Sequence, residues 1–239
     1  MKPNADNYLP EGKWAFNEDV AQVFDEMLEN SIPSYQQMRL WTTRLAFNYL
    51  KPGGLVVDLG ASGGDAFAPL LAAEPSAKFL AVEASEPMRA LLARRFQNAP
   101  NVTISPCDLR YESAAVLPPA SIDVVLSILT LMFVPVEYRQ EVLSNVHRAL
   151  KPGGALLLVE KVLGADACMD RVLRDEYYKF KADNGYTQEA IVRKKHSLEG
   201  VLVPVTAEWN LDLLRSVGFS HAECFWRALN FCGFLAIRT

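Results

Sequence analysis

Between residues 55 and 161 the chain alternates short apolar runs with helical patterns, and three successive runs end in an acidic residue. The runs LVVDLG, KFLAVEAS and VTISPCD carry Asp58, Glu83 and Asp108 at or beside their ends. Short Val- and Leu-rich runs of this kind are typical of strands that are buried in a parallel sheet. Strand–helix alternation predicts a mostly parallel sheet with helices on both faces. The three acids should therefore meet at the sheet edge where ligands bind in open α/β sheets.

Four further apolar runs complete a predicted seven-stranded sheet: IDVVLSIL at 122–129, GALLLVEK at 154–161, AECFWRAL and FCGFLAIR. A helix pattern at 137–150 precedes the fifth run and should end at the KPGG of 151–154, as the helix of 35–50 should end at the KPGG of 51–54. The last two runs are joined by a short link, which predicts an antiparallel C-terminal strand.

Two helical segments flank this core. Residues 15–50 predict an N-terminal helical cap, and residues 165–204 predict a helical insertion after the fifth strand. With 239 residues and 50% hydrophobic residues, the chain can bury one sizeable core, so we expect a single domain over 1–239.

Composition excludes several classes of function. The net charge of −4 argues against broad nucleic-acid binding, which needs a basic face. The four cysteines show no CxxC spacing and the three histidines are far apart in the chain, so no metal site is expected. No apolar run is long enough to cross a bilayer, and the N-terminus lacks a secretory apolar core, so a cytoplasmic protein is expected.

The segment VVDLGASGGDA places Asp58, Gly60 and Ser62 at the turn between the first strand and the next helix. Glycine there lets a ligand approach the backbone, and a helix N-terminus offers free N–H groups. Glu83 could bind a ribose diol, and Asp108 could meet the amine of a purine. The competing interpretations are a tight turn with positive φ for the glycines and a helix N-cap for Asp108.

NAD and S-adenosylmethionine both suit three such acids, but DLGASGG is not the GxGxxG of dinucleotide folds. DLGASGG, AVEAS, SPCDL and LKPGGALLLVEK resemble the successive motifs of class I S-adenosylmethionine-dependent methyltransferases, and they cover most of the chain. This resemblance implies a Rossmann-like sheet and S-adenosylmethionine as the cofactor.

One branch is more similar than the rest, the carboxy-S-adenosylmethionine synthases, which carboxylate the cofactor with prephenate during modification of the tRNA wobble uridine. FNEDVAQVFDEMLENSIPSY, EKV, FKADNGYTQEAI and LNFCGFLAI carry the similarity. It implies S-adenosylmethionine or its carboxylated form as the ligand, and a homodimer. It also implies cofactor contacts from Tyr35, Gly60, Ala61, Ser62, Glu83, Ala84, Asp108 and Leu109.

The chain departs from that family pattern at three positions. Lys195 stands where the synthases have an arginine that grips the added carboxylate, and lysine lacks arginine's planar two-pronged grip. The asparagine that follows the fourth strand becomes Ile128, or Ser127 if the alignment slips by one, and we take Ser127 as the predicted cofactor contact. Ala61 replaces a cysteine.

The stretch RKKH at 193–196 concentrates positive charge in an acidic chain. It can be a solvated helix face, a clamp for an anionic substrate centred on Lys195, or a phosphate contact for RNA, for which no wider basic stripe exists. We place the clamp first, because the insertion should cover the cofactor site. The predicted catalytic residues are Lys195, His196 and Tyr186, with Tyr177 and Tyr178 as further candidate bases.

Three functions follow from these patterns. The first is a methyltransferase that acts on a small anionic acceptor, for which the enzyme supplies mainly alignment. The second is a carboxy-S-adenosylmethionine synthase that uses lysine in place of arginine. The third is a noncatalytic module that binds S-adenosylmethionine. Neither a membrane nor a nucleic acid is an expected partner.

Overall fold

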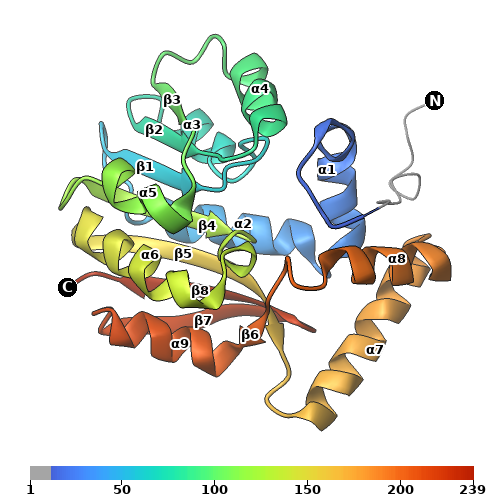
Figure 1. The fold of residues 1–239 in the computed structure, drawn as a ribbon. Coiled ribbons are helices and arrows are strands. Elements are labelled where there is room, and N and C mark those ends of the chain that lie inside the picture. The colour runs from blue at the N-terminus through green and yellow to red at the C-terminus, as the bar shows by residue number, and fades with distance from the viewer. Residues whose placement is uncertain (1–11) are drawn as a thin grey trace.

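The predicted strands pair in parallel at the centre of the structure, a computed structural model that describes residues 12–239. They form a sheet in the order β3-β2-β1-β4-β5-β8-β7, and a short β6 pairs with the end of β5 (Figure 1). The strands are β1 (Leu55–Leu59), β2 (Lys78–Val82), β3 (Val102–Ser105), β4 (Ile122–Ile128), β5 (Leu150–Leu163), β6 (Val205–Thr206), β7 (His221–Ala228) and β8 (Phe231–Ile237).

Helices cover both faces of this sheet, as the alternation predicts. Val57 and Val125 pack among α5, α6 and α9 on one face. Val56 and Val124 pack among α2, α3 and α4 on the other, because successive strand residues point to opposite sides. These helices are α2 (Tyr35–Phe47), α3 (Ala68–Ala73), α4 (Glu86–Arg95), α5 (Leu109–Val116), α6 (Val136–Ala149) and α9 (Ala207–Ser216).

The C-terminal strands confirm the predicted topology, because β8 runs antiparallel to both β5 and β7. The second KPGG differs from the prediction. It is not a turn before the fifth strand but part of β5, where Leu150 already pairs with Ile122 and Ala155 pairs with Val124. The residues between them form an irregular bulge around Gly153, which has a φ of 78°.

The predicted cap and insertion are helical; α2 packs on the sheet, whereas α1, α7 and α8 lie to one side of it (Figure 1). The cap contains α1 (Glu18–Ser31) before α2, and the insertion contains α7 (Ala167–Asp183) and α8 (Gln188–Leu198). A backbone hydrogen bond of 2.9 Å from Trp14 to Ser197 ties the start of the cap to the end of α8. Among residues 12–239, no helix is long and apolar enough to cross a membrane.

Candidate cofactor and substrate site

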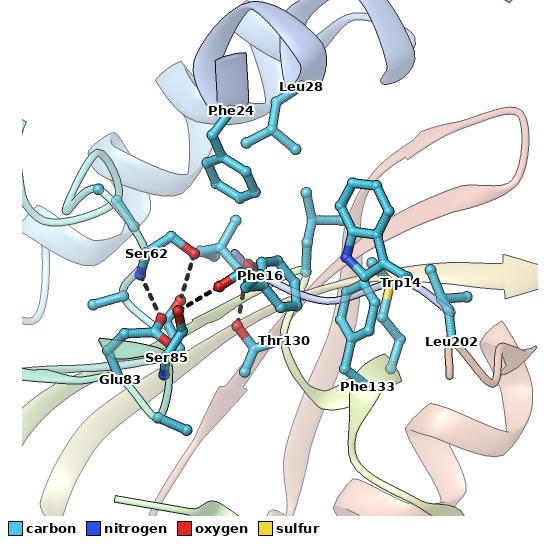
Figure 2. A pocket seen from close by; sticks show the side chains of 18 of the residues that line it. Trp14, Phe16, Phe24, Leu28, Ser62, Glu83, Ser85, Thr130, Phe133 and Leu202 are labelled. Carbon is cyan, nitrogen blue, oxygen red and sulfur yellow. Dashed lines mark hydrogen bonds between the residues drawn. The ribbon is translucent and has the colours of Figure 1, made fainter. Parts of the chain in front are cut away.

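A cavity of about 630 Å³ lies at the carboxyl ends of β1, β2 and β4, beneath α1 and α8. One side, the carboxylate end, is formed by Asp58, Glu83 and Asp108. The other side, the lysine end, is formed by Trp14, Phe133, Lys161, Lys194 and Leu202. Figure 2 shows Ser62 and Glu83 on one side of the cavity and Trp14, Phe133 and Leu202 on the other.

Glu83 joins the glycine-rich turn to the start of α4. Its two carboxylate oxygens accept hydrogen bonds from the backbone N–H groups of Ser62, at 2.9 Å, and Ser85, at 2.8 Å (Figure 2). Burial raises the pKa of Glu83, and the donors at Ser85 and Ser62 oppose that shift. The acid at the end of the second strand therefore shapes the turn and still lines the cavity.

The turn itself differs from the expectation of free N–H groups at a helix N-terminus. The N–H groups of Gly60 and Ala61 donate to the carbonyl of Val82, at 2.8 and 3.0 Å, and the N–H of Ser62 donates to Glu83. The next helix, α3, begins only at Ala68. The turn thus offers none of these three N–H groups to a ligand.

Gly60 is nevertheless required by the packing of the turn. Its φ is 70°, and a Cβ there would overlap the side chain of Thr130. Both the positive φ and the close approach exclude other residues. The tight-turn interpretation is therefore correct for Gly60, and the same turn brings Asp58 and Ser62 to the cavity wall.

Asp58 is the buried carboxyl group without a matching partner at this end. Its side chain is 2% exposed, and its Oδ2 has no hydrogen-bond partner among residues 12–239. Burial raises the pKa of Asp58 to about 8, against the attraction of Arg39. A cationic ligand in the cavity would stabilise the ionised form. S-adenosylmethionine carries a sulfonium and an ammonium group, so the carboxyl groups at this end fit that cofactor.

Asp108 is a helix N-cap, as the competing interpretation predicts, and it also lines the cavity. It is the N-cap of α5 and accepts from the N–H of Arg110 at 3.0 Å. The guanidinium of Arg110 also donates to both carboxylate oxygens. Hydrogen bonding to Arg110 lowers the pKa of Asp108. A purine amine would have to share these oxygens with Arg110.

Most of the other predicted cofactor contacts line the cavity, namely Tyr35, Ala61, Ala84 and Leu109. Ser127 is the exception and is corrected by the structure. It is 3% exposed within β4 and does not line the cavity, whereas Ile128 does. Neighbouring residues of a strand point to opposite faces, so only one of the two can reach the ligand. Of the two positions, the one that lines the cavity carries an apolar side chain.

The three predicted catalytic residues are also absent from the cavity wall. Lys195 is exposed and lines only an adjoining hollow of about 170 Å³, which shares Lys161 and Lys194 with the larger cavity. His196 is exposed on α8. Tyr186 is buried, and its hydroxyl lies 2.9 Å from Oγ of Ser31, a hydrogen bond that ties the insertion to α1. None of the three is placed to touch a cofactor in the larger cavity.

Lys161 and Lys194 line the cavity instead. The Lys161 ammonium lies 4.7 Å from the ring centroid of Tyr177, and the Lys194 ammonium lies 4.7 Å from that of Trp14. Burial lowers the pKa of Lys161 to about 8. Burial also holds the pKa of Lys194 well below its ordinary value, and the neighbouring charges of Lys181 and Lys161 lower it further. Within the described residues neither Lys161 nor Lys194 forms a salt bridge.

Aromatic rings form the rest of the lysine end, a feature that the sequence patterns did not indicate. Phe16 makes edge contacts with Trp14, Phe24 and Phe133, at centroid distances of 6.0, 6.1 and 5.2 Å, and Figure 2 shows these four rings together. A hydrogen bond of 2.7 Å from Oγ of Ser85 to the carbonyl of Phe16 joins this cluster to the carboxylate end. The cavity therefore offers an apolar aromatic surface beside two lysines.

Comparison with known proteins agrees with this geometry. A family model described as "Methyltransferase domain" matches residues 57–156. A phosphoethanolamine N-methyltransferase from Haemonchus contortus aligns over 93% of this chain and 58% of its own, with a TM-score of 0.65 and 16% identity. A methyltransferase structure from Methanococcus maripaludis aligns over 97% of this chain and 98% of its own, with a TM-score of 0.61 and 17% identity. The fold is that of the class I S-adenosylmethionine-dependent methyltransferases.

Curated relatives narrow the class further. The carboxy-S-adenosyl-L-methionine synthase of Methylococcus capsulatus is 36% identical over 94% of this chain and 93% of its own length. The synthase of Desulforapulum autotrophicum is 34% identical over 93% of this chain and 90% of its own. The chain belongs to the carboxy-S-adenosyl-L-methionine synthase family and is an S-adenosylmethionine-dependent transferase.

Proposed function

We propose that this chain forms carboxy-S-adenosyl-L-methionine from S-adenosylmethionine and a small carboxylate donor, the reaction for which its relatives are named. The observation that carries the proposal is the presence of Lys161 and Lys194 in the cofactor cavity, where neither forms a salt bridge with a described residue. A carboxylate on the transferred carbon needs a buried cation beside it. Lys195, which stands in place of the family arginine, is exposed and does not line this cavity, whereas Lys194 at the preceding position of α8 does.

The two ends of the cavity would bind different substrates. Asp58 and Glu83 would hold the cationic cofactor, with Tyr35, Ala61, Ala84 and Leu109 packed around it. At the lysine end, an anionic donor would place its acid group by Lys161 and Lys194 and its apolar body against the aromatic rings. Its charge would also raise the depressed pKa values of Lys161 and Lys194, because a nearby anion favours the ammonium form.

Methyl transfer to a small anionic acceptor is the second candidate, and Ile128 favours it. Ile128 lines the cavity and Ser127 does not, so in either alignment of the family asparagine this part of the cavity wall lacks a polar side chain. The same lysines would then hold the acceptor rather than the added carboxylate. Both candidates share a cytoplasmic enzyme with a small-molecule second substrate, and the homodimer that the resemblance implies is part of the proposal.

Mass spectrometry distinguishes these candidates. Protein purified without added ligand is denatured, and the released nucleoside is weighed, before and after incubation with S-adenosylmethionine and prephenate. A species heavier than S-adenosylmethionine by one carboxyl group supports the synthase. Release of S-adenosylhomocysteine without the heavier species would show methyl transfer and would reject the first candidate. Retention of unmodified cofactor under every condition would support the noncatalytic binding module.

A further inference from the structure

Behind the wall of the lysine end lies a pair of fully buried charged residues, Arg139 on α6 and Glu160 on β5. Arg139 is 0% exposed and Glu160 is 1% exposed. Neither lines the cavity. Burial raises the pKa of Glu160 to about 8, and the positive charge of Arg139 works against that shift. The pair therefore cannot touch a substrate directly.

Arg139 and Glu160 instead bond the backbone of the turn η2 (Leu131–Phe133) from both sides. Arg139 Nε donates to the carbonyl of Val134 at 2.8 Å, and its Nη2 donates to the carbonyl of Met132 at 3.3 Å. Glu160 accepts from the N–H groups of Leu131 and Met132. Two buried side chains thus fix the carbonyl and the N–H groups of a single turn.

Arg139 also bonds the segment that follows α8, which is joined to the same turn. Arg139 Nη2 also donates to the carbonyl of Val203 at 2.6 Å, and the N–H of Val203 donates to Met132 at 2.9 Å. The turn contributes Met132 and Phe133 to the cavity wall, and the segment contributes Leu202. The contacts of Arg139 and Glu160 therefore converge on one wall of the lysine end.

Stability alone does not explain this arrangement. Burying ionised groups carries a large desolvation penalty, and apolar residues of similar volume often serve stability as well or better. Here Nη1 of Arg139 and Oε1 of Glu160 also lack hydrogen-bond partners within the part of the chain that the structure describes. What an apolar pair could not provide is a bonded backbone for the turn and the adjoining segment.

We propose that Arg139 and Glu160 are positioning residues that set the shape of the lysine end for the second substrate. The inference rests on the proposed function only in assigning the lysine end to that substrate. The carboxylate end is formed by other contacts, chiefly those of Glu83 with Ser62 and Ser85. Disturbing the pair should therefore loosen one end of the cavity and leave the other intact.

The first test is Glu160→Gln, with Asp123→Asn as the matched control. Asp123 is likewise 2% exposed, and it bonds the N–H of Leu55 at 2.9 Å and Lys151 at 2.7 Å, at the amino ends of β1 and β4. In the presence of S-adenosylmethionine, hydrogen–deuterium exchange is expected to be at least tenfold faster at residues 131–134 and 203 in Glu160→Gln than in the wild type. It should stay unchanged there in Asp123→Asn, and S-adenosylmethionine affinity should stay within twofold in both variants.

Exchange and cofactor affinity need no turnover, so they test the pair even if the proposed reaction fails. The positioning role is overturned if exchange at 131–134 and 203 is unchanged in Glu160→Gln. It is also overturned if the cofactor affinity falls by as large a factor as the exchange accelerates. Where prephenate is turned over, Glu160→Gln should raise its KM about tenfold or more with little change in kcat.

The double variant Arg139→Met/Glu160→Met separates positioning from stability. It removes both side chains and fills the same space with apolar ones, so the unfolding midpoint of the double variant should lie close to that of the wild type. Exchange at 131–134 should remain fast, and the KM for prephenate should remain raised. Recovery of exchange protection together with stability would show that the pair serves only to hold the fold, and the inference would be rejected.

Discussion

Replacing Asp58 by asparagine should weaken cofactor binding while making the free protein more stable at alkaline pH. Burial raises the pKa of Asp58 to about 8, and its Oδ2 accepts no hydrogen bond from any described residue. Because this folded-state pKa is raised, the protonated carboxyl group favours folding below its ordinary pKa of 3.8, and that contribution is lost as the pH rises through 8. Asparagine is never charged and escapes this loss.

Cofactor binding should show the opposite dependence. If the cationic cofactor binds the ionised carboxylate, about 1% of Asp58 is ready at pH 6 and about half at pH 8, so affinity should rise about 50-fold over that range, at about 1.4 kcal/mol per tenfold. In Asp58→Asn this rise disappears. Affinity at pH 8 should fall about 10- to 100-fold, the equivalent of a lost hydrogen bond to a charged group, about 1.5–3 kcal/mol.

Calorimetric titration with S-adenosylmethionine at pH 6, 7 and 8 measures the slope, and thermal unfolding of the free protein measures the stability. The cofactor's own amine also titrates, so the decisive quantity is the difference in slope between the wild type and Asp58→Asn. Asp123→Asn, which alters a buried carboxyl group away from the cavity, should keep the wild-type slope. Equal slopes in Asp58→Asn and the wild type would refute the role given to Asp58.

Three further outcomes follow from the structure. Gly60→Ala should abolish cofactor binding detectable by calorimetry, because a Cβ at a φ of 70° would overlap Thr130; retained affinity would mean that the turn can relax. Lys194→Met should lower kcat/KM for the anionic substrate at least tenfold, whereas Lys195→Met should change it less than twofold, since only Lys194 lines the cofactor cavity. If steady-state kinetics show the larger loss in Lys195→Met, Lys195 is the residue that binds the carboxylate, as in the family pattern. Tyr186→Phe should lower the free energy of unfolding by about 1 kcal/mol in denaturant titration, by removing one buried hydrogen bond, and a loss of activity without a loss of stability would return Tyr186 to catalysis.

The carboxylate end could be predicted because it depends on a regular rule. In a parallel sheet the carboxyl ends of neighbouring strands share one edge, so Asp58, Glu83 and Asp108 had to meet once the strands were assigned. The hydrogen bonds within the turn could not be predicted in the same way. Whether an N–H at Gly60 faces a ligand or the carbonyl of Val82 depends on where α3 begins, and helix boundaries are poorly marked in an Ala-rich segment.

The lysine end was missed for two physical reasons. On α8, Lys194 and Lys195 lie three and four positions after the buried Ile191, so both satisfy a helical period and only packing decides which one faces inward. Trp14 reaches the site through a backbone hydrogen bond to Ser197, a contact between distant parts of the chain that no local pattern encodes. The competing interpretation of the RKKH stretch as a solvated face fits Lys195 and His196, which are exposed, but not Lys194.

Charges of opposite sign at the two ends of one cavity also bear on how two substrates would bind together. Asp58 and the lysine pair, Lys161 and Lys194, each carry a pKa shifted toward the neutral form by burial, and none of the three forms a salt bridge with another. A cation bound beside Asp58 restores its charge, and an anion bound beside the lysines restores theirs. The cofactor's positive charge then attracts the anion across a cavity from which water is displaced, where charges interact more strongly than in solution. Binding of either substrate should therefore strengthen binding of the other, and by linkage the two effects must be equal in size.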